Sequence, residues 1–260
     1  MKLMFWLATA LLIACTTGCT CTTDHRYNEE QLQRLLTTKK CQGCDLWRAN
    51  LFEANLAKAN LRGADLVGAQ LEAADLREAD LTGAKFAFYQ SGTSIYNSCT
   101  GLDITGSLLR ANLSDAKLEG AKLTGVNMGG AVLDHAVLRG ASMSGAQLVS
   151  TQLNLADLRR VYLDRAILFG ANLQGADLRD AHLDAAEFNQ ANLSGANLSG
   201  ADLNRADFSG ANLSGANLSG ANLKSVKFQK ANLIGVKLDG AQLDGANFTQ
   251  TIMPDGKRHR

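Results

Sequence analysis

Residues 191–200 read ANLSGANLSG, a five-residue unit that occurs twice without change. The same period extends in both directions. Every fifth residue from Leu108 to Met253 is Leu, Phe or Met, at thirty positions, and every fifth residue from Leu46 to Phe86 is Leu or Phe, at nine. The residue two places before each of these is Ala or, at a few positions, another small or β-branched residue. A repeat of this extent determines the architecture of most of the chain.

A period of five matches neither the 3.6 residues of an α-helix nor the two residues of a strand. It indicates a chain that turns a corner every five residues. The Leu and the Ala two places before it then point inward, and the three polar or variable positions point outward. Gly is common at the last position, where it adopts a positive φ at little cost.

The unit resembles the Ala-(Asn/Asp)-Leu-x-x consensus of the pentapeptide-repeat family, over about three quarters of the chain. The resemblance implies an all-β fold, a right-handed four-sided parallel β-helix solenoid with four repeats per coil. Thirty-nine repeats give a rod roughly 45 Å long at about 4.8 Å per coil. A coil of twenty residues would stack Asp207 beside Lys227. It would also form two columns, of Phe188, Phe208, Phe228 and Phe248 and of Asn172, Asn192, Asn212 and Asn232.

The N-terminus has the composition of an export signal. One Lys is followed by an apolar run from Leu3 to Ala14, too short to span a bilayer. Residues 12–15, LIAC, resemble the lipobox of bacterial lipoproteins, which predicts a signal peptide over 1–14 and a lipid on Cys15. Cys19 is a poorer lipidation candidate, and ordinary cleavage near Ala14 is the alternative. Either way the protein is expected to be exported, to the periplasm or thylakoid lumen if it follows exported relatives of the family.

Residues 15–26 are expected to be a tether, followed over 27–40 by a helix that caps the first coil. Asn28 and Gln31 have the spacing of a capping box. Tyr27, Leu32, Leu35 and Leu36 can share one side of this helix. A solenoid needs such an end cap to cover its core.

The first repeat block, 41–86, and the second, 108–253, are out of phase, because Phe86 and Leu108 are 22 residues apart. Residues 87–107 are therefore an insertion. It is either a loop that leaves a corner and re-enters the same helix, or a break between segments with different axes. Loops on a rigid scaffold often carry function, which makes Tyr89 and Tyr96 candidate contacts with a partner. A merely tolerated insertion is the alternative.

Cys41 and Cys44 occupy the inward positions of the first repeats, so we expect a structural disulfide at the join with the cap helix. Buried free thiols and a redox-active pair are the alternatives. No further ligands for zinc are close in sequence. Residues 254–260 are expected to be a turn and a short basic tail.

No catalytic constellation appears in the sequence, and no metal site or cofactor is expected. The four His are scattered, and the many Asp follow from the repeat itself. The formal net charge of +1 gives no sign of a nucleic-acid partner.

The sequence features bear on three functions. A non-catalytic structural or protein-interaction scaffold of the cell envelope, with an unknown protein partner and a membrane contact if Cys15 is acylated, fits best. A DNA mimic that binds a type II topoisomerase, as some family members do, is disfavoured by export and the near-neutral charge. A glycan-acting β-helix enzyme would need a groove of carboxylates across coils. The sequence leaves the oligomeric state open.

Overall fold

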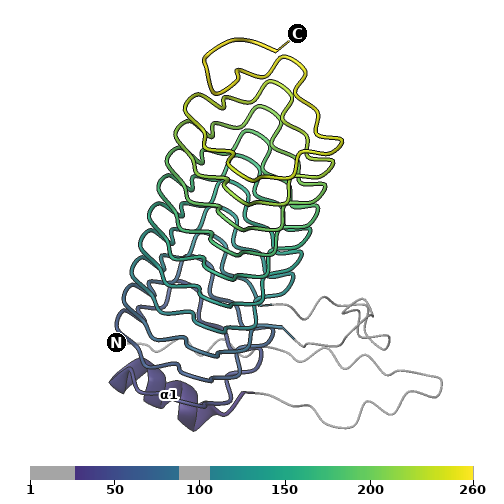
Figure 1. Cartoon of the computed structure of the whole chain (residues 1–260). Helices are drawn as coiled ribbons and strands as arrows, with labels where there is room; N and C mark the ends of the chain where they lie inside the picture. Colours follow the sequence, from purple (N-terminus) through teal and green to yellow (C-terminus); the bar gives the residue numbers. More distant parts are fainter. Residues whose placement is uncertain (1–26, 88–105, 260) are drawn as a thin grey trace, which may run out of the picture.

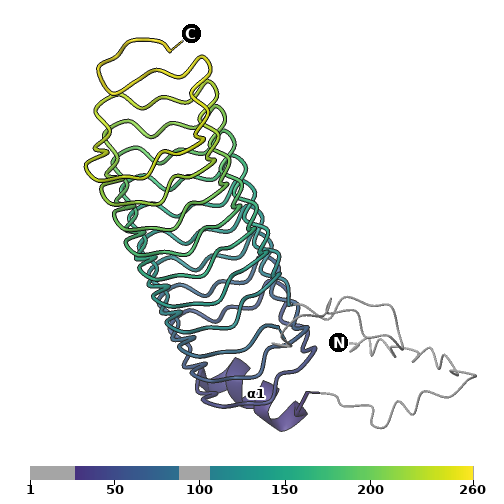
Figure 2. The same cartoon turned by 45° about the vertical axis from the view of Figure 1, so that its right-hand side comes forward.

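The computed structural model describes residues 27–87 and 106–259. In this part of the chain one helix, α1 (Glu29–Thr38), lies across the end of a single stack of coils, as Figure 1 and Figure 2 show from two directions. Parallel bridges join residues twenty apart, such as Asn172 with Asn192, and they recur every five residues along the chain. Each coil therefore has four sides with one bridge residue on each. The prediction of four repeats per coil is confirmed.

Every backbone N–H of a typical repeat has a partner. The N–H of Asn192 donates to the preceding coil over 2.9 Å, and those of Leu193 and Gly195 donate to the following coil over 2.7 and 2.9 Å. The N–H of Ala196 turns back to Leu193 over 3.0 Å. The fifth N–H, of Ser194, donates to the side-chain Oδ1 of Asn192 over 3.2 Å. The Asn/Asp position is thus polar because its side chain satisfies the one amide that the coils leave unpaired.

The corner between two repeats has the hydrogen bond and the positive φ of a type II turn. Gly195, at the third position of its turn, has φ +67°. Other residues accept the same backbone where Gly is absent, including Leu155 at φ 56° and Arg160 at φ 54°. Their side chains point outward, so the cost is the backbone strain alone.

The interior is a continuous column of fully buried Leu, Phe and Ala side chains. The predicted Phe column is confirmed, with ring centroids 4.7, 5.6 and 5.3 Å apart from Phe188 to Phe248. Thr151 and Thr251 replace Ala at two inward positions, and each hydroxyl donates to a backbone carbonyl one coil below, over 2.9 and 2.5 Å. These buried hydroxyls are therefore satisfied.

The two repeat blocks share one register. Gln70 pairs with Ser107 and Lys85 with Lys122, and the N–H of Gly106 donates to the carbonyl of Phe86 over 2.9 Å. A loop that re-enters the same helix requires this continuity. Ala87, Gly106 and Ser107, assigned to the insertion from sequence, belong to the coils at its two ends.

Helix α1 takes the place of a coil below the first one. Asn28 caps it by accepting the N–H of Gln31 over 3.1 Å, as predicted. The second half of the predicted capping box is wrong: the N–H of Asn28 donates to the carbonyl of Asp45, and Gln31 Oε1 accepts the N–H of Asp45 over 2.7 Å. Within the rod, a preceding coil would pair with the carbonyl and the N–H of Asp45. Here the backbone of Asn28 and the side chain of Gln31 take the place of that coil.

The buried side of α1 is narrower than predicted. Leu32 and Leu35 are buried on the first coil and Tyr27 packs beside them, whereas Leu36 is 39% exposed. Leu35 and Leu36 are consecutive residues and point about 100° apart around the helix axis, so the coil covers Leu35 and leaves Leu36 partly exposed.

The C-terminal residues fold back instead of trailing from the rod. Ile252 forms an antiparallel bridge with Arg258, and the N–H of His259 donates to the carbonyl of Thr251 over 2.8 Å. The His259 ring lies 6.1 Å from that of Phe248. The expected turn at Pro254 is present, but the basic residues after it form the second arm of a hairpin.

Candidate functional site

The predicted site residues fall into two groups. Cys15, Tyr89 and Tyr96 lie outside the described residues. Cys41 and Cys44 are buried at the start of the first coil, with their Cα atoms 5.2 Å apart and their sulfur atoms joined in a disulfide. Arg34 of α1 donates to Cys44 Sγ over 2.9 Å, so the pair lies directly under the cap helix.

The outer sides of the coils carry ladders of polar side chains. In the Asn column, each Nδ2 donates to Oδ1 of the Asn one coil below, over 3.0 to 3.2 Å from Asn192 to Asn232. This confirms the predicted ladder. Lys227 Nζ lies 3.3 Å from Asp207 Oδ2, as the twenty-residue period predicts.

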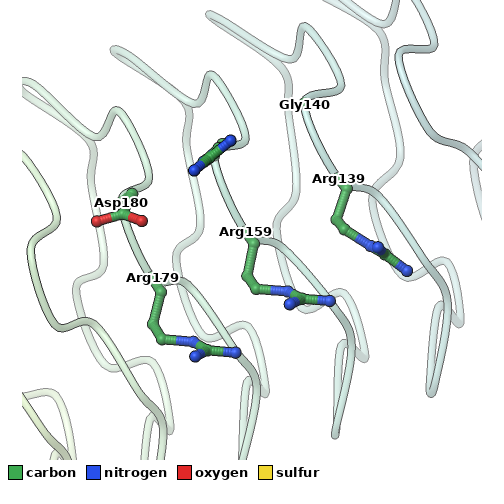
Figure 3. A pocket seen from close by; sticks show the side chains of 6 residues that line it. Arg139, Gly140, Arg159, Arg179 and Asp180 are labelled. Carbon is green, nitrogen blue, oxygen red and sulfur yellow. The ribbon is translucent and has the colours of Figure 1, made fainter.

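An arginine ladder, defined here as Arg139, Arg159 and Arg179, runs along one side of the rod. These residues follow the buried Leu of three successive coils, so their side chains emerge in parallel, as Figure 3 shows. Two carboxylates lie between them. Asp157 Oδ2 accepts from Arg139 Nε over 2.8 Å and from Arg159 Nη2 over 2.7 Å, and Asp177 Oδ2 accepts from Arg179 Nη2 over 2.7 Å.

These contacts lower the pKa of both carboxyl groups. For Asp157 the largest cause is the hydrogen bond from Arg159, which outweighs the opposing effect of burial. For Asp177 burial is the largest single effect and raises the pKa, but the bonds from Arg179 together outweigh it. Both groups therefore remain ionised at neutral pH, and the ladder alternates in charge along the axis.

A shallow hollow of about 550 Å³ lies beside the ladder. Gly140, Arg160 and Asp180 complete its lining. A guanidinium has five N–H donors, and among the described residues the ion pairs and hydrogen bonds of the ladder use only Nε and Nη2. The Nη1 groups of the ladder and the Arg160 side chain remain as donors toward a ligand. The surface can thus bind carboxylate, sulfate or phosphate oxygens.

Sequence reasoning missed this ladder, although a signal was present. Asp-Leu-Arg occurs at 75–77, 157–159 and 177–179, and in each copy the Arg pairs with the Asp two residues before it, over 2.6 to 2.7 Å. The last two copies are twenty residues apart, which places them on adjacent coils. The Arg occupies a variable position of the repeat, so the Ala-(Asn/Asp)-Leu-x-x consensus does not predict it.

Tyr162 and His182 form a second outward stack around the corner from the ladder. Their rings are 4.5 Å apart and inclined by 4°. Within 27–87 and 106–259, no group of three or more His, Cys, Asp or Glu is placed to hold a metal ion. Over the same ranges no helix has the length and apolar character needed to cross a bilayer.

Comparisons with known proteins agree with this geometry. The family of pentapeptide repeats matches in eight copies, over residues 40–66, 54–87, 111–148, 146–184, 186–224 and 216–253. No curated protein matches the chain. Among solved structures, HetL from Nostoc sp. strain PCC 7120, a pentapeptide repeat protein involved in heterocyst differentiation regulation, is 33% identical. That match covers 90% of this chain and 100% of HetL with a TM-score of 0.54.

Two further structures match more weakly. QnrB1, a plasmid-mediated fluoroquinolone resistance protein, is 21% identical over 71% of this chain and 86% of its own, with a TM-score of 0.40. A pentapeptide repeat protein of the Arabidopsis thaliana thylakoid lumen is 24% identical over 55% of this chain and 69% of its own, with a TM-score of 0.24. From the repeats and their coils, the chain belongs to the pentapeptide-repeat family, whose members are right-handed quadrilateral β-helices and generally non-enzymatic structural or interaction proteins.

Proposed function

We propose that this protein is a non-catalytic scaffold of the cell envelope, exported and held at a membrane by a lipid on Cys15, and that it docks a protein partner on its outer surface. The observation that carries the proposal is the filled interior. Buried Leu, Phe and Ala occupy the column from the first coil to the last fully covered one. Chemistry is therefore confined to the outside of the rod, where the polar groups are arranged in ladders.

Similarity to HetL supports a role in interaction, since that protein is described as taking part in regulation. The arginine ladder is the surface most suited to a partner. Arg donors fixed in one plane recognise carboxylates with defined geometry, and they lose less side-chain entropy on binding than mobile Lys would. The DNA-mimic alternative has less support, because this side of the rod presents guanidinium donors and not a row of anions.

The anchor is tested by labelling cells with a fatty-acid analogue and fractionating them, comparing wild type with Cys15→Ala. We expect label and envelope association in the wild type only. Unlabelled wild-type protein in the soluble fraction would rule out lipidation and leave the docking proposal intact.

The docking surface is tested with a photo-crosslinking residue at Ser199, one coil above Arg179 in the same column. A matched control carries it at Ser214, on another side of the rod. We expect an envelope protein to be captured from Ser199 and not from Ser214, and capture to be lost in Arg139→Gln/Arg179→Gln. Equal capture from both sites would refute a specific surface.

A further inference from the structure

A basic cluster, defined here as Arg34, Lys39, Lys40 and Lys58, surrounds a hollow at the end of the rod that α1 covers. The hollow measures about 770 Å³, and Thr38, Gln42 and Asn60 complete its lining. Arg34 comes from the second half of α1 and Lys39 is its C-terminal cap, whereas Lys58 belongs to the first coil. Cap helix and coil therefore both contribute cations to one concave surface.

These cations are poorly neutralised. Among the described residues, the one ion pair of the cluster joins Lys58 to Glu78 over 3.6 Å, with side chains 72% and 56% exposed. Such an exposed pair is worth little. Lys39 Nζ donates to the backbone carbonyl of Asn55, which holds the ammonium in place without cancelling its charge.

The acidic residues of the helix lie at its other end. Glu29 and Glu30 occupy the first turn of α1, where they complement the helix dipole. The two acidic residues thus lie at the opposite end of the helix from Lys39. Two large apolar side chains are also exposed near this end of the rod, Leu36 at 39% and Phe52 at 56%.

We propose that the basic cluster binds the anionic headgroups of the membrane to which the protein is tethered. The proposal rests on the proposed anchor at Cys15. The chain from Cys15 to Tyr27 has twelve peptide links and spans at most about 40 Å even when fully extended. The cluster lies at the end of the rod where this tether joins, so it is the charged hollow closest to the bilayer.

Charge and chain chemistry favour lipid over an acidic protein as the occupant. Lys ammonium groups on flexible stems suit mobile headgroups, and exposed Leu and Phe can enter the interfacial layer beside them. The arginine ladder is less suited to mobile headgroups, because ion pairs with Asp157 and Asp177 hold its guanidinium groups in place.

The test compares mature full-length protein from producing cells with two charge-matched triple variants. Lys39→Gln/Lys40→Gln/Lys58→Gln removes three cations of the cluster, and Lys224→Gln/Lys230→Gln/Lys237→Gln removes three near the far end. Binding is measured by co-sedimentation with phosphatidylcholine vesicles, with and without phosphatidylglycerol. At about a fivefold loss per cation near the surface, the removal of three cations should cost the cluster variant roughly 100-fold in the phosphatidylglycerol-dependent part of binding. The far-end variant should bind like the wild type.

The two vesicle types separate this proposal from the anchor. Binding to pure phosphatidylcholine reports the lipid anchor, and the increment with phosphatidylglycerol reports the cluster and should decrease as salt is raised. A missing anchor would abolish the first and leave the second. Absence of any increment, or an equal loss in both triple variants, would overturn the assignment and leave an acidic protein surface as the ligand.

Discussion

At the scale of single residues, the last position of each repeat is set by backbone geometry. Gly195 and Ala185 occupy equivalent corners, with φ +67° and +55°. A Cβ added at Gly195 would meet nothing within 4 Å, so only the backbone is strained by a substitution there. The preference for Gly in the sequence is therefore conformational and not a matter of space.

We expect Gly195→Ala to lower the free energy of unfolding by about 1 kcal/mol, because Ala pays the left-handed penalty that Gly avoids. Ala185→Gly removes that penalty but loosens the unfolded chain, and should be neutral or slightly stabilising. Denaturant unfolding of the two variants measures both. If both variants were destabilised equally, the positive φ of the corner would not explain the preference for Gly at this position.

The Asn position is selected by hydrogen bonding. Asn192→Ala leaves the Ser194 N–H without its acceptor and interrupts the Asn ladder, which we expect to cost about 1–2 kcal/mol. Asn192→Asp keeps the acceptor but cannot donate to Asn172, so its loss should be smaller. If thermal unfolding showed Asn192→Asp to be less stable than Asn192→Ala, the side-chain ladder would contribute more to stability than the hydrogen bond to the Ser194 N–H.

At the scale of elements, the Phe column carries much of the packing in the last coils. Phe208 is fully buried between two stacked rings, whereas Phe248 lies in the half-covered last coil. Phe208→Ala should cost about 3–5 kcal/mol and Phe248→Ala clearly less, because the end can relax. Equal losses in denaturant unfolding would indicate that the last coil is as well covered as the interior.

The arginine ladder makes stability depend on pH. The pKa of Asp157 is lowered in the fold, so its contribution is complete above the unfolded value near 3.9 and is lost as pH falls below that toward the folded value. Asp157→Asn should therefore be less stable than the wild type at pH 7. Between about pH 4 and 2 it should lose less stability than the wild type. An unchanged acid slope would mean that the ladder does not stabilise the fold.

Elements that follow the repeat could be predicted, and those that leave it could not. The Phe and Asn columns and the Asp207–Lys227 pair follow from counting twenty residues. The docking of Gln31 on Asp45 and the C-terminal hairpin depend on free backbone groups at the two ends of the solenoid, which no period encodes. The residues of the arginine ladder are twenty apart in the sequence, but they occupy variable positions of the repeat. Their alignment is recognised only when adjacent coils are placed side by side.

At the scale of the whole molecule, the relative position of the basic cluster and the arginine ladder is fixed only if the two repeat blocks form one continuous rod. The basic cluster lies in the block before residues 88–105, and the arginine ladder lies in the block after them. Their separation along a common axis would place the cluster at the membrane and the ladder away from it. Parallel bridges from Gln70 to Ser107 and from Lys85 to Lys122 join the two blocks into one rod.

A cysteine pair tests the single column most directly. In a Cys99→Ser background, Gln70→Cys/Ser107→Cys places two thiols on bridged residues of adjacent coils, whose Cα atoms at about 4.8 Å suit a disulfide. Gln70→Cys/Asn112→Cys is the control, because Asn112 lies on the next side of the coil and bridges Asp75 instead. Mild oxidation followed by mass spectrometry should show a crosslink in the first pair and none in the second. Failure of the first pair to crosslink, or equal crosslinking of both, would contradict one continuous rod.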